Sequence, residues 1–595
     1  MLQDQDQAAV QEVRGKVEQA YAAWQSYRTF SQQQVDAVVE AVAAAGRKHA
    51  RRLAELAVAE TGMGNADDKY AKNMLCADLL PRAIAGVKTV GVLREDPSRK
   101  ITEIGVPQGV VAAICPTTNP TSTVFYKAII ALKSGNAIVL SPHPRAKDCT
   151  CAAAAVVMEA AAAAGAPQGL VQCLENSSLE ATQALMKHPR TGVILATGGA
   201  GMVRAAYSSG KPAFGVGPGN VPVLIDTSAP LATAVQRVID GKRFDYGTVC
   251  SSEQVVVAER SLREPMLAAF RAGGAYVLND AERQAVERTL FTGTTTVRAE
   301  CVGQSPQRIA QLAGFQVPGE TKILLAEIGG VGKDHPLSAE KLSPVLAVLF
   351  TECFDSAVKA CESILQFGGL GHTSVIHAED TARVKRFGEH VSAFRVLVNT
   401  SSPQGSVGIT TNLQPSMTLG CGAMAGNITS DNVGPLHLIN IKRVAWAVRT
   451  PQEAAGGPAA ASGGAVIDKA ALIAAVERYL AQKGIAVGGK TVEAAVAAAL
   501  PAAPAAAPSC GCSANKAAGT APAPTPAPVP APAPSIPAPK IQIVDFVCEA
   551  DVREALSRKK KIFIGPKTIV TPAARDAASQ EEVLVMAERP GPAGK

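Results

Sequence analysis

Cys250 occupies a place in the sequence that is typical of a catalytic nucleophile. It lies in residues 244–254, FDYGTVCSSEQ, between a glycine-containing turn and a run of valines. A thiol at the end of a structural element can attack a substrate while a nearby backbone N–H group stabilises the charge that develops. The alternative is a buried structural cysteine, the more common role of a cysteine beside a valine run. Cys250 alone leaves both interpretations open.

Asn119 is a second candidate for the same chemistry. It lies in the loop 115–123, CPTTNPTST, which follows an apolar run and precedes a predicted helix. The following Pro120 restricts its backbone, so that its side-chain amide is suited to stabilising an oxyanion. An Asx-turn or a helix cap is the alternative role for an asparagine at such a place.

Two glycine-rich loops indicate a ligand that carries phosphate. Residues 196–201, ATGGAG, follow an apolar run and open a predicted helix, so their backbone N–H groups are placed to bind a pyrophosphate. A single turn of this kind is weak support. Residues 211–220, KPAFGVGPGN, contain three further glycines that permit close approach of the backbone to a ligand. No Asp or Glu occurs in residues 211–225.

The elements that position these loops follow the alternation of a parallel α/β sheet. Residues 7–63 have helical spacing, which ends at the glycines of residues 60–64. Beyond them, short apolar runs alternate with helical stretches, and ligands bind at the carboxyl ends of such strands. The predicted strands are 110–115, 137–140, 170–173 and 193–196, and a second α/β region, 228–430, includes strands 254–257 and 345–349.

Composition bounds the class of protein. A chain of 595 residues with 47% hydrophobic content can bury several large cores. The net charge of +7 forms no stripe of the kind that binds nucleic acid, and the basic run 558–561 is interpreted as a solvated helix end. The 13 cysteines lack the spacing of a disulfide framework, so a reducing cytoplasm is expected. No apolar stretch is long enough for a membrane span.

Six motifs together resemble the CoA-acylating branch of the aldehyde dehydrogenase superfamily, which oxidises short aldehydes to acyl-CoA. The motifs are TTNPTST at 117–123, LSPHPRAK at 140–147, GPGN at 217–220, VCSSEQ at 249–254, GLGHTS at 369–374 and PSMTLGCG at 415–422. The resemblance implies the α/β aldehyde dehydrogenase fold, with a Rossmann-like cofactor domain, an α/β catalytic domain and, in this chain, a partly disordered C-terminal extension.

The resemblance also implies a role for each catalytic candidate. Cys250 matches the nucleophile that attacks the aldehyde carbonyl, and the Asn119 amide with the Cys250 backbone N–H would stabilise the resulting oxyanion. Hydride would pass to NAD and leave a thioester on Cys250. Glu340 matches the glutamate that orients the nicotinamide ribose, with a surface glutamate as its alternative. His372 matches a histidine that would position CoA or move a proton, with a structural role as its alternative.

The resemblance further addresses the acceptor and the cofactor. Hydrolytic relatives carry a water-activating glutamate where Val216 stands, so CoA is expected as the acceptor in place of water. Residues 141–143, Ser-Pro-His, place no Lys or Arg at the strand end, which favours NAD, although Arg145 leaves NADP open. The residues expected to bind the cofactor are Thr117, Ser141, Pro142, His143, Thr197, Gly198, Gly199, Gly217 and Glu340. No metal site is expected.

The chain divides into six predicted segments. Residues 466–483 place apolar side chains on one face of a helix, and residues 501–540 contain 12 Pro and 14 Ala, a composition typical of polyproline II. The segments are an NAD-binding domain at 1–227 with an oligomerisation hairpin near 95–107, a catalytic domain at 228–430, a return and oligomerisation segment at 431–450, an amphipathic helix at 464–485, a linker at 501–540 and a small docking segment at 541–595.

An amphipathic helix tethered by an Ala/Pro linker resembles the encapsulation peptides of enzymes in bacterial microcompartments. The resemblance implies shell or cargo proteins as partners, a location inside a microcompartment, and propionaldehyde or acetaldehyde as substrate. A homo-oligomer, dimer or tetramer, is expected. The alternative for the helix is that it packs on its own enzyme. The alternatives for the function are a hydrolytic dehydrogenase or a non-catalytic docking scaffold. The pair Cys510 and Cys512 is interpreted as part of a flexible segment, with a metal-binding fragment as its alternative.

Overall fold

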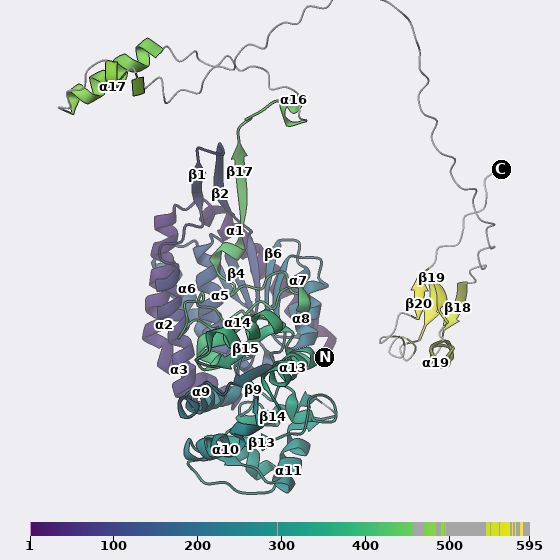
Figure 1. Cartoon of the computed structure of the whole chain (residues 1–595). Helices are drawn as coiled ribbons and strands as arrows, with labels where there is room; N and C mark the ends of the chain where they lie inside the picture. Colours follow the sequence, from purple (N-terminus) through teal and green to yellow (C-terminus); the bar gives the residue numbers. More distant parts are fainter. Residues whose placement is uncertain are drawn as a thin grey trace, which may run out of the picture. The chain divides into compact units, whose positions relative to one another are not determined.

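Two parallel β-sheets form the cores of residues 1–462, one of the two units into which the chain divides (Figure 1). The structure is a computed structural model. It describes residues 2–293, 295–455, 469–483, 490–492, 494–495, 543–547, 549–558, 560–571, 574, 578 and 583–586.

The first sheet has the strand order of a doubly wound nucleotide-binding fold. Its strands are parallel in the order β5-β4-β3-β6-β7, which reverses direction between β3 and β6 and so creates a crevice at their carboxyl ends. The strands are β3 (Val110–Ile114), β4 (Ala137–Ser141), β5 (Val171–Cys173), β6 (Thr191–Thr197) and β7 (Ala213–Val216). The four strands predicted in this region are confirmed, with ends that differ by at most two residues.

Helices cover both faces of this sheet. α5 (Pro120–Lys133) and α6 (Lys147–Ala163) pack on one face beneath α2 (Gln32–Thr61), and α1 (Leu2–Tyr27) lies with α7 (Leu179–Lys187) on the other. Every residue of α5 is buried, because this helix lies between the sheet and α2. Its sequence is accordingly apolar around most of its circumference.

The helical spacing expected over 7–63 is confirmed, and this region consists of the two helices α1 and α2. Ser31 caps α2, and its hydroxyl accepts from the Gln34 N–H while the Gln34 side chain accepts from the Ser31 N–H. The predicted glycine stop is confirmed, since Gly62 ends α2 with φ 67°. That conformation is disfavoured for residues with a Cβ.

The second sheet is formed by later parts of the chain. Its strands are parallel in the order β10-β13-β14-β9-β8-β15-β16. α9 (Leu231–Arg243) and α10 (Arg263–Ala272) share a core with one face, and α13 (Phe354–Ile364) with the other. In chain order the strands are β8 (Val221–Ile225), β9 (Glu253–Glu259), β10 (Ala275–Val277), β13 (Ile323–Glu327), β14 (Val345–Thr351), β15 (Gly371–His377) and β16 (Ala393–Val398).

The chain passes from the first sheet to the second within residues 217–220. β8 therefore belongs to the second sheet, although it lies inside the range 1–227 that the sequence assigns to the NAD-binding domain. An apolar strand carries no local signal of the sheet to which it pairs, so this partner was not evident from the sequence.

A three-stranded antiparallel sheet projects from the body of residues 1–462 (Figure 1). β1 (Gly91–Asp96) and β2 (Ile101–Pro107) form a hairpin over the region where one was expected, near 95–107. β17 (Ile439–Ala445) pairs along β2 from Pro107 to Ile101 and so returns the chain to the hairpin.

Shorter elements complete this unit. They are α3 (Ala66–Met74), α4 (Leu80–Ile84), α8 (Ala200–Tyr207), α11 (Asp280–Leu290), β11 (Phe291–Thr292), β12 (Thr296–Val297), α12 (Pro306–Leu312), α14 (Thr381–His390), α15 (Ser402–Ser406) and α16 (Pro451–Ala454), with 3-10 turns η3 (Phe244–Gly247) and η6 (Pro336–Ser338) beside the site described below.

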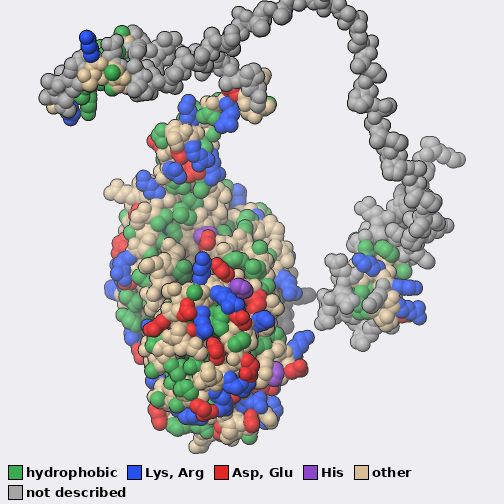
Figure 2. Space-filling model, in the orientation of Figure 1, with side chains coloured by type: hydrophobic (Ala, Val, Ile, Leu, Met, Phe, Trp, Pro, Cys, Tyr) green, Lys and Arg blue, Asp and Glu red, His purple; other side chains and the backbone are tan. Residues whose placement is uncertain are grey.

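On the face shown in Figure 2, acidic and basic side chains are interspersed. Among the described residues, none of the helices has the length and apolar character that crossing a bilayer requires.

Residues 463–595 form the second unit. The helix expected over 466–483 is present as α17 (Lys469–Gln482). Towards the C-terminus, β18 (Ile543–Val547), β19 (Ile562–Val570) and β20 (Leu584–Met586) form a small parallel sheet beside α19 (Glu549–Ser557), around a core that includes Val547 and Val552. The linker expected at 501–540, with Cys510 and Cys512, lies outside the described residues.

Candidate functional site

Cys250 lies in the loop between η3 and β9, with its thiol half-buried. Three successive residues before it have left-handed backbones: Asp245 (φ 45°), Tyr246 (φ 51°) and Gly247 (φ 74°). They form a tight turn at the end of α9, which sets the direction of the loop. Burial, followed by the charge of Glu340, raises the pKa of the Cys250 thiol to about 12. The resting thiol is therefore protonated, and the proton must leave when the sulfur attacks.

Asn119 approaches the same loop from the first sheet. It stands at the N-cap position of α5, but its side chain makes no capping hydrogen bond. The Nδ2 atom instead donates to Thr118 Oγ1 at 3.0 Å and to the Thr248 carbonyl at 3.4 Å. Thr248 precedes Cys250 by two residues, so the amide group faces the loop that carries the thiol. The two residues first considered for nucleophile and oxyanion chemistry thus come together from opposite sheets.

Gly219 joins three other parts of the site. Its N–H donates to Glu340 Oε1 at 3.3 Å. A Cβ placed on Gly219 would lie 2.0 Å from the Cys250 carbonyl oxygen and 3.3 Å from Cδ2 of His372. No side chain fits at this point, which explains why a glycine is required in the motif at 217–220.

Glu340 lies between η6 and β14 and is half-buried, so it is not a fully solvated surface glutamate. Burial raises the pKa of its carboxyl to about 7, even though the Gly219 N–H, Lys242 and Lys341 favour the charged form. Near neutral pH this carboxyl is therefore divided between its two protonation states. Because its charge raises the pKa of Cys250, the two groups influence each other's ionisation.

His372 is fully buried in β15. Its Nδ1 is 2.9 Å from Thr373 Oγ1, while Nε2 has no hydrogen-bond partner among the described residues. Burial, together with the charge of Arg395, lowers the pKa of this imidazole to about 3. The ring is therefore neutral at physiological pH, and its buried Nε2 has unused hydrogen-bonding capacity.

The residues after β4 are occupied by local contacts. Ser141 Oγ lies 3.0 Å from Thr182 Oγ1, and Pro142 is buried. Nδ1 of the exposed His143 accepts from the Arg145 N–H at 3.1 Å. These bonds stabilise the loop and engage the polar atoms that were expected to contact a cofactor. Burial also lowers the pKa of His143, with Arg145 as a further cause.

The loops after β3 and β6 lie at the point where the strand order reverses. Thr197 Oγ1 is buried without a hydrogen-bond partner among the described residues. Gly199 is the N-cap of α8 and offers no capping side chain, and Gly198 precedes it. Thr117 follows β3 and is half-buried. An unpartnered hydroxyl beside an uncapped helix N-terminus, in the crevice of a doubly wound sheet, fits the phosphates of a dinucleotide.

Gly217 lies in the segment that connects the two sheets and is half-buried. A Cβ placed there would meet no atom within 4 Å. This glycine, unlike Gly219, therefore has free space beside it.

A cluster of buried charges contacts Asn119, and the sequence did not predict it. Lys69 and Lys72, one turn apart on α3, both form ion pairs with Asp245 Oδ2. Lys72 Nζ also contacts Asn119 Oδ1, and Lys69 Nζ donates to the Thr118 carbonyl at 2.9 Å. In the sequence, residues 66–74, ADDKYAKNM, have the charge density of a solvated helix face, and no local feature connects them to Asp245.

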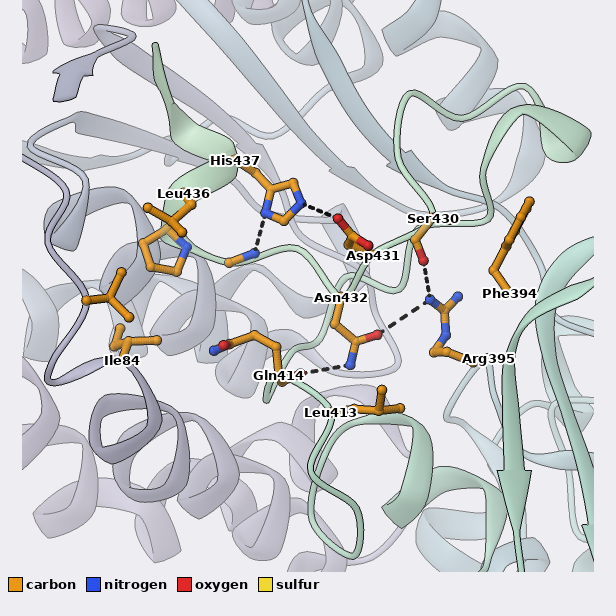
Figure 3. Close-up of a pocket in the computed structure, with 13 residues that line it drawn as sticks. Ile84, Phe394, Arg395, Leu413, Gln414, Ser430, Asp431, Asn432, Leu436 and His437 are labelled. Atoms are coloured by element: carbon orange, nitrogen blue, oxygen red, sulfur yellow. Dashed lines mark hydrogen bonds and ion pairs between the residues drawn. The ribbon is translucent and has the colours of Figure 1, made fainter. Parts of the chain in front are cut away.

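A separate cavity of about 360 Å³ lies near β16 and the segment 413–437 (Figure 3). In Figure 3, His437 faces Asp431, with Nε2 and Oδ2 3.4 Å apart, and Arg395 donates to the Ser430 carbonyl at 3.0 Å. Neither Cys250 nor Asn119 lines this cavity. Arg395, which lines this cavity, also acts electrostatically on Cys250. Its positive charge lowers the pKa of the thiol, whereas burial raises it.

Comparison with known proteins identifies relatives of the chain. Residues 1–286 match the model of the aldehyde dehydrogenase family. The bifunctional aldehyde-alcohol dehydrogenase AdhE of Escherichia coli K12 is 46% identical over 441 residues, which is 73% of this chain and 49% of that protein. The chain thus spans about half the length of that relative.

Solved structures extend the comparison. An acetylating aldehyde dehydrogenase from Geobacillus thermoglucosidasius is 49% identical, with a TM-score of 0.74, and the match covers 75% of this chain and 98% of that one. A propionaldehyde dehydrogenase from the fucose utilisation microcompartment of Clostridium phytofermentans is 26% identical, with a TM-score of 0.68 and coverage of 73% and 97%.

Proposed function

Because the chain belongs to the aldehyde dehydrogenase family, we propose that it oxidises a short-chain aldehyde, propionaldehyde or acetaldehyde, and transfers the acyl group to CoA. The observation that carries this proposal is the convergence of Cys250, Glu340 and His372 around Gly219, with the Asn119 amide facing the same loop. The name of the acetylating enzyme from Geobacillus thermoglucosidasius supports the same class of reaction.

The first step is the attack of the Cys250 sulfur on the aldehyde carbonyl. The thiol loses its proton, an S–C bond forms, and the carbonyl oxygen becomes the oxyanion of a thiohemiacetal. The Asn119 Nδ2 and the Cys250 backbone N–H are the donors assigned to this oxygen. The long contact from Nδ2 to the Thr248 carbonyl, 3.4 Å, leaves this amide hydrogen available to a closer acceptor.

When bound, NAD would supply the hydride acceptor. As hydride left the thiohemiacetal carbon, its C–O bond would become a carbonyl and a thioester would remain on Cys250. Thr117, Thr197, Gly198, Gly199 and Gly217 are the residues assigned to holding the dinucleotide. We assign Ser141, Pro142 and His143 to the shape of the adenosine end of this site, because Oγ of Ser141 and Nδ1 of His143 are already bonded within the chain. Glu340 is assigned to the nicotinamide ribose, because its carboxylate can accept hydrogen bonds from the ribose hydroxyls.

The thiol of CoA then attacks the thioester on Cys250, so that the Cys250 sulfur leaves as a thiolate and acyl-CoA forms. Residues 211–225 contain no carboxylate to activate water, and Val216 is a buried strand residue. Water attack is therefore expected to be slow compared with attack by a thiol. The unpartnered Nε2 of His372 supports a role in positioning CoA or in moving its proton.

NADH formation from propionaldehyde, measured with and without CoA, tests this function. We expect NADH to form in multiple turnovers only when CoA is present, and Cys250→Ala to abolish it. Cys353→Ala removes an exposed cysteine and serves as the matched control, with unchanged activity. Full activity without CoA establishes a hydrolytic dehydrogenase, while full activity of Cys250→Ala removes Cys250 from the mechanism.

We further propose that the enzyme is cytoplasmic and is enclosed in a bacterial microcompartment through α17, with shell or cargo proteins as its partners. Support comes from the helix at the expected place, the Ala/Pro-rich residues that follow it, and the microcompartment origin of the Clostridium phytofermentans neighbour. Deletion of 464–485 is expected to abolish co-purification with shells and preserve activity. Deletion of 541–595 is the comparison, and loss there alone would place the signal in that segment.

Self-association into a dimer or tetramer is also proposed. The projecting sheet of β1, β2 and β17 supports it, because β17 exposes Ile441 (43%) and Val444 (42%). Light scattering of the purified chain measures the mass directly, and a monomer at all concentrations contradicts this proposal.

A further inference from the structure

Lys72 makes contacts that reach from α3 to both sides of the proposed active site. Its side chain is almost fully buried, and Nζ contacts Asn119 Oδ1 and Asp245 Oδ2 and lies 3.4 Å from Thr248 Oγ1. One ammonium group therefore links the amide assigned to the oxyanion with the turn that precedes Cys250. We propose that Lys72 is a positioning residue that fixes the orientation of the Asn119 amide, and that Asp245 holds Lys72 for this purpose. This inference rests on the proposed function.

The chemistry of the two groups determines which way the amide faces. A lysine ammonium has three donors and no acceptor, and an asparagine side chain has one carbonyl oxygen and one NH₂ group. Only the oxygen of Asn119 can face Lys72 favourably, so Nδ2 must point to the opposite side. Nδ2 is found there, directed at Thr118 Oγ1 and the Thr248 carbonyl.

The reverse orientation of Asn119 would disable the site. Turning the amide by half a rotation would bring NH₂ against the ammonium and leave two donors facing each other. It would also place the amide oxygen where the oxyanion develops, and two electronegative atoms would then repel. Lys72 excludes this orientation, and its charge also polarises the amide so that Nδ2 becomes a stronger donor.

Asp245 is itself held by several donors. Its Oδ1 accepts from the Asn65 N–H at 2.9 Å, and Oδ2 accepts from Lys69 at 3.1 Å and Thr248 Oγ1 at 2.7 Å. Asp245 also belongs to the left-handed turn that leads to Cys250. The Asp245 carboxylate therefore fixes Lys72 relative to the loop that carries Cys250. Because Lys72 contacts Asn119, it also fixes the position of Asn119 relative to Cys250.

The same contacts make a test by substitution practicable. In Lys72→Met, Asp245 keeps Lys69, Thr248 and Asn65 as partners, so its charge stays compensated and the fold is expected to survive. Lys72→Gln also removes the charge but retains an N–H donor for Asn119 Oδ1. Lys133→Met is the matched control, because Lys133 is equally buried and ion-paired, with Asp36, at the far end of α5.

A double-mutant cycle with Asn119→Ala distinguishes positioning from a general structural role. The kcat for NADH formation is measured at saturating propionaldehyde, NAD and CoA. We expect Asn119→Ala to lower kcat by roughly a hundredfold or more, and Lys72→Met by roughly ten- to a hundredfold, with little change in the KM for aldehyde. In the Asn119→Ala background, Lys72→Met should change kcat by less than about twofold. Lys72→Gln should recover part of the loss, and Lys133→Met should leave kcat unchanged.

The pH dependence provides a readout that does not depend on Lys72→Met folding. Burial lowers the pKa of Lys72 to about 8, with Asp245 acting in the opposite direction. The charged or titratable groups that face it are Asp245, Lys69, Asp68 and Cys76. The ammonium is charged below pH 8 and loses its charge above it. The ratio of the kcat of the unaltered enzyme to that of Lys72→Gln is therefore expected to fall as the pH rises through about 8.

Two results overturn the inference. One is additive losses of kcat for Lys72→Met and Asn119→Ala, which show that Lys72 acts independently of the amide. The other is a pH-independent ratio of the two kcat values. If Asn119→Ala itself leaves kcat unchanged, the proposed role of Asn119 fails first, and the inference fails with it. The two failures are thus separated by the single variant Asn119→Ala.

Discussion

The two sides of the candidate site use their polar groups in different ways. Around Gly219, the half-buried Cys250 and Glu340 have raised pKa values, and the buried Nε2 of His372 has no hydrogen-bond partner among the described residues. After β4, Oγ of Ser141 and Nδ1 of His143 are already hydrogen-bonded within the chain. We infer that the perturbed groups around Gly219 serve the proposed chemistry, whereas the loop after β4 serves the shape of the proposed cofactor site.

Among the changes that test this comparison, the largest effect is expected from filling the space at Gly219. Gly219→Ala places a methyl group 2.0 Å from the Cys250 carbonyl oxygen, so the loop must shift. A displacement of about 1 Å at a reacting group costs roughly a hundredfold in rate, and we expect at least that loss in kcat. Gly388→Ala is the control, because a Cβ there meets nothing within 4 Å and the residue lies in α14, outside the candidate site. Equal kcat values for both variants would contradict the assigned convergence.

A second expectation concerns the ionisation of Cys250. Because burial and Glu340 raise the pKa of the thiol to about 12, the thiolate fraction rises about tenfold per pH unit throughout the range below it. Alkylation of Cys250 by iodoacetamide, followed by mass spectrometry of its peptide, should therefore accelerate from pH 7 to pH 10 without a plateau. The exposed Cys353, whose pKa hydrogen bonds from Ser356 lower, should reach its plateau within that range. A Cys250 plateau near neutral pH would contradict a thiol pKa raised by burial and by Glu340.

Glu340→Gln sharpens the comparison by separating reactivity from catalysis. Loss of the carboxylate charge lowers the pKa of Cys250, so alkylation at pH 8 should be faster by roughly tenfold. NADH formation should nevertheless fall, because the proposed acceptor of the ribose hydroxyls would lose its charge and one of its two acceptor oxygens. If alkylation and NADH formation both became faster in Glu340→Gln, Glu340 would act only through the pKa of the thiol.

The smallest effects are expected on the nucleotide side. Ser141→Ala removes a hydroxyl bonded to Thr182 and should lower the free energy of unfolding by about 1 kcal/mol with an unchanged KM for NAD. Thr197→Val removes a hydroxyl that has no partner among the described residues, so stability should hold while the KM for NAD rises roughly three- to tenfold. If Ser141→Ala raised the KM for NAD and Thr197→Val lowered the stability, the loop after β4 would bind the cofactor and the loop after β6 would have the structural role.

Local sequence patterns predicted the elements that carry their own signal. The apolar runs at 110–115 and 193–196 became β3 and β6, and Gly62 ends α2 where a glycine stop was expected. The six motifs led to the aldehyde dehydrogenase family, which the comparisons confirm. The predicted roles of Cys250 and Asn119 remain predictions that the experiments above address.

Features that depend on distant pairing were not predictable in the same way. β8 pairs with β9 and β15 of the second sheet, and its apolar sequence does not indicate these partners. Lys72 and Asp245 are 173 residues apart, and each resembles an ordinary surface charge until the two sheets bring them together. Long-range ion pairs of this kind leave no periodic trace in a single sequence.

The central claim is that Cys250 carries the acyl group and gives it to a second thiol. Mass spectrometry of the enzyme mixed with propionaldehyde and NAD, before and after CoA is added, tests it most directly. We predict one propionyl group on the peptide that contains Cys250, and its transfer to propionyl-CoA when CoA is added. Sustained NADH formation without CoA and without an acyl group on Cys250 would contradict the account.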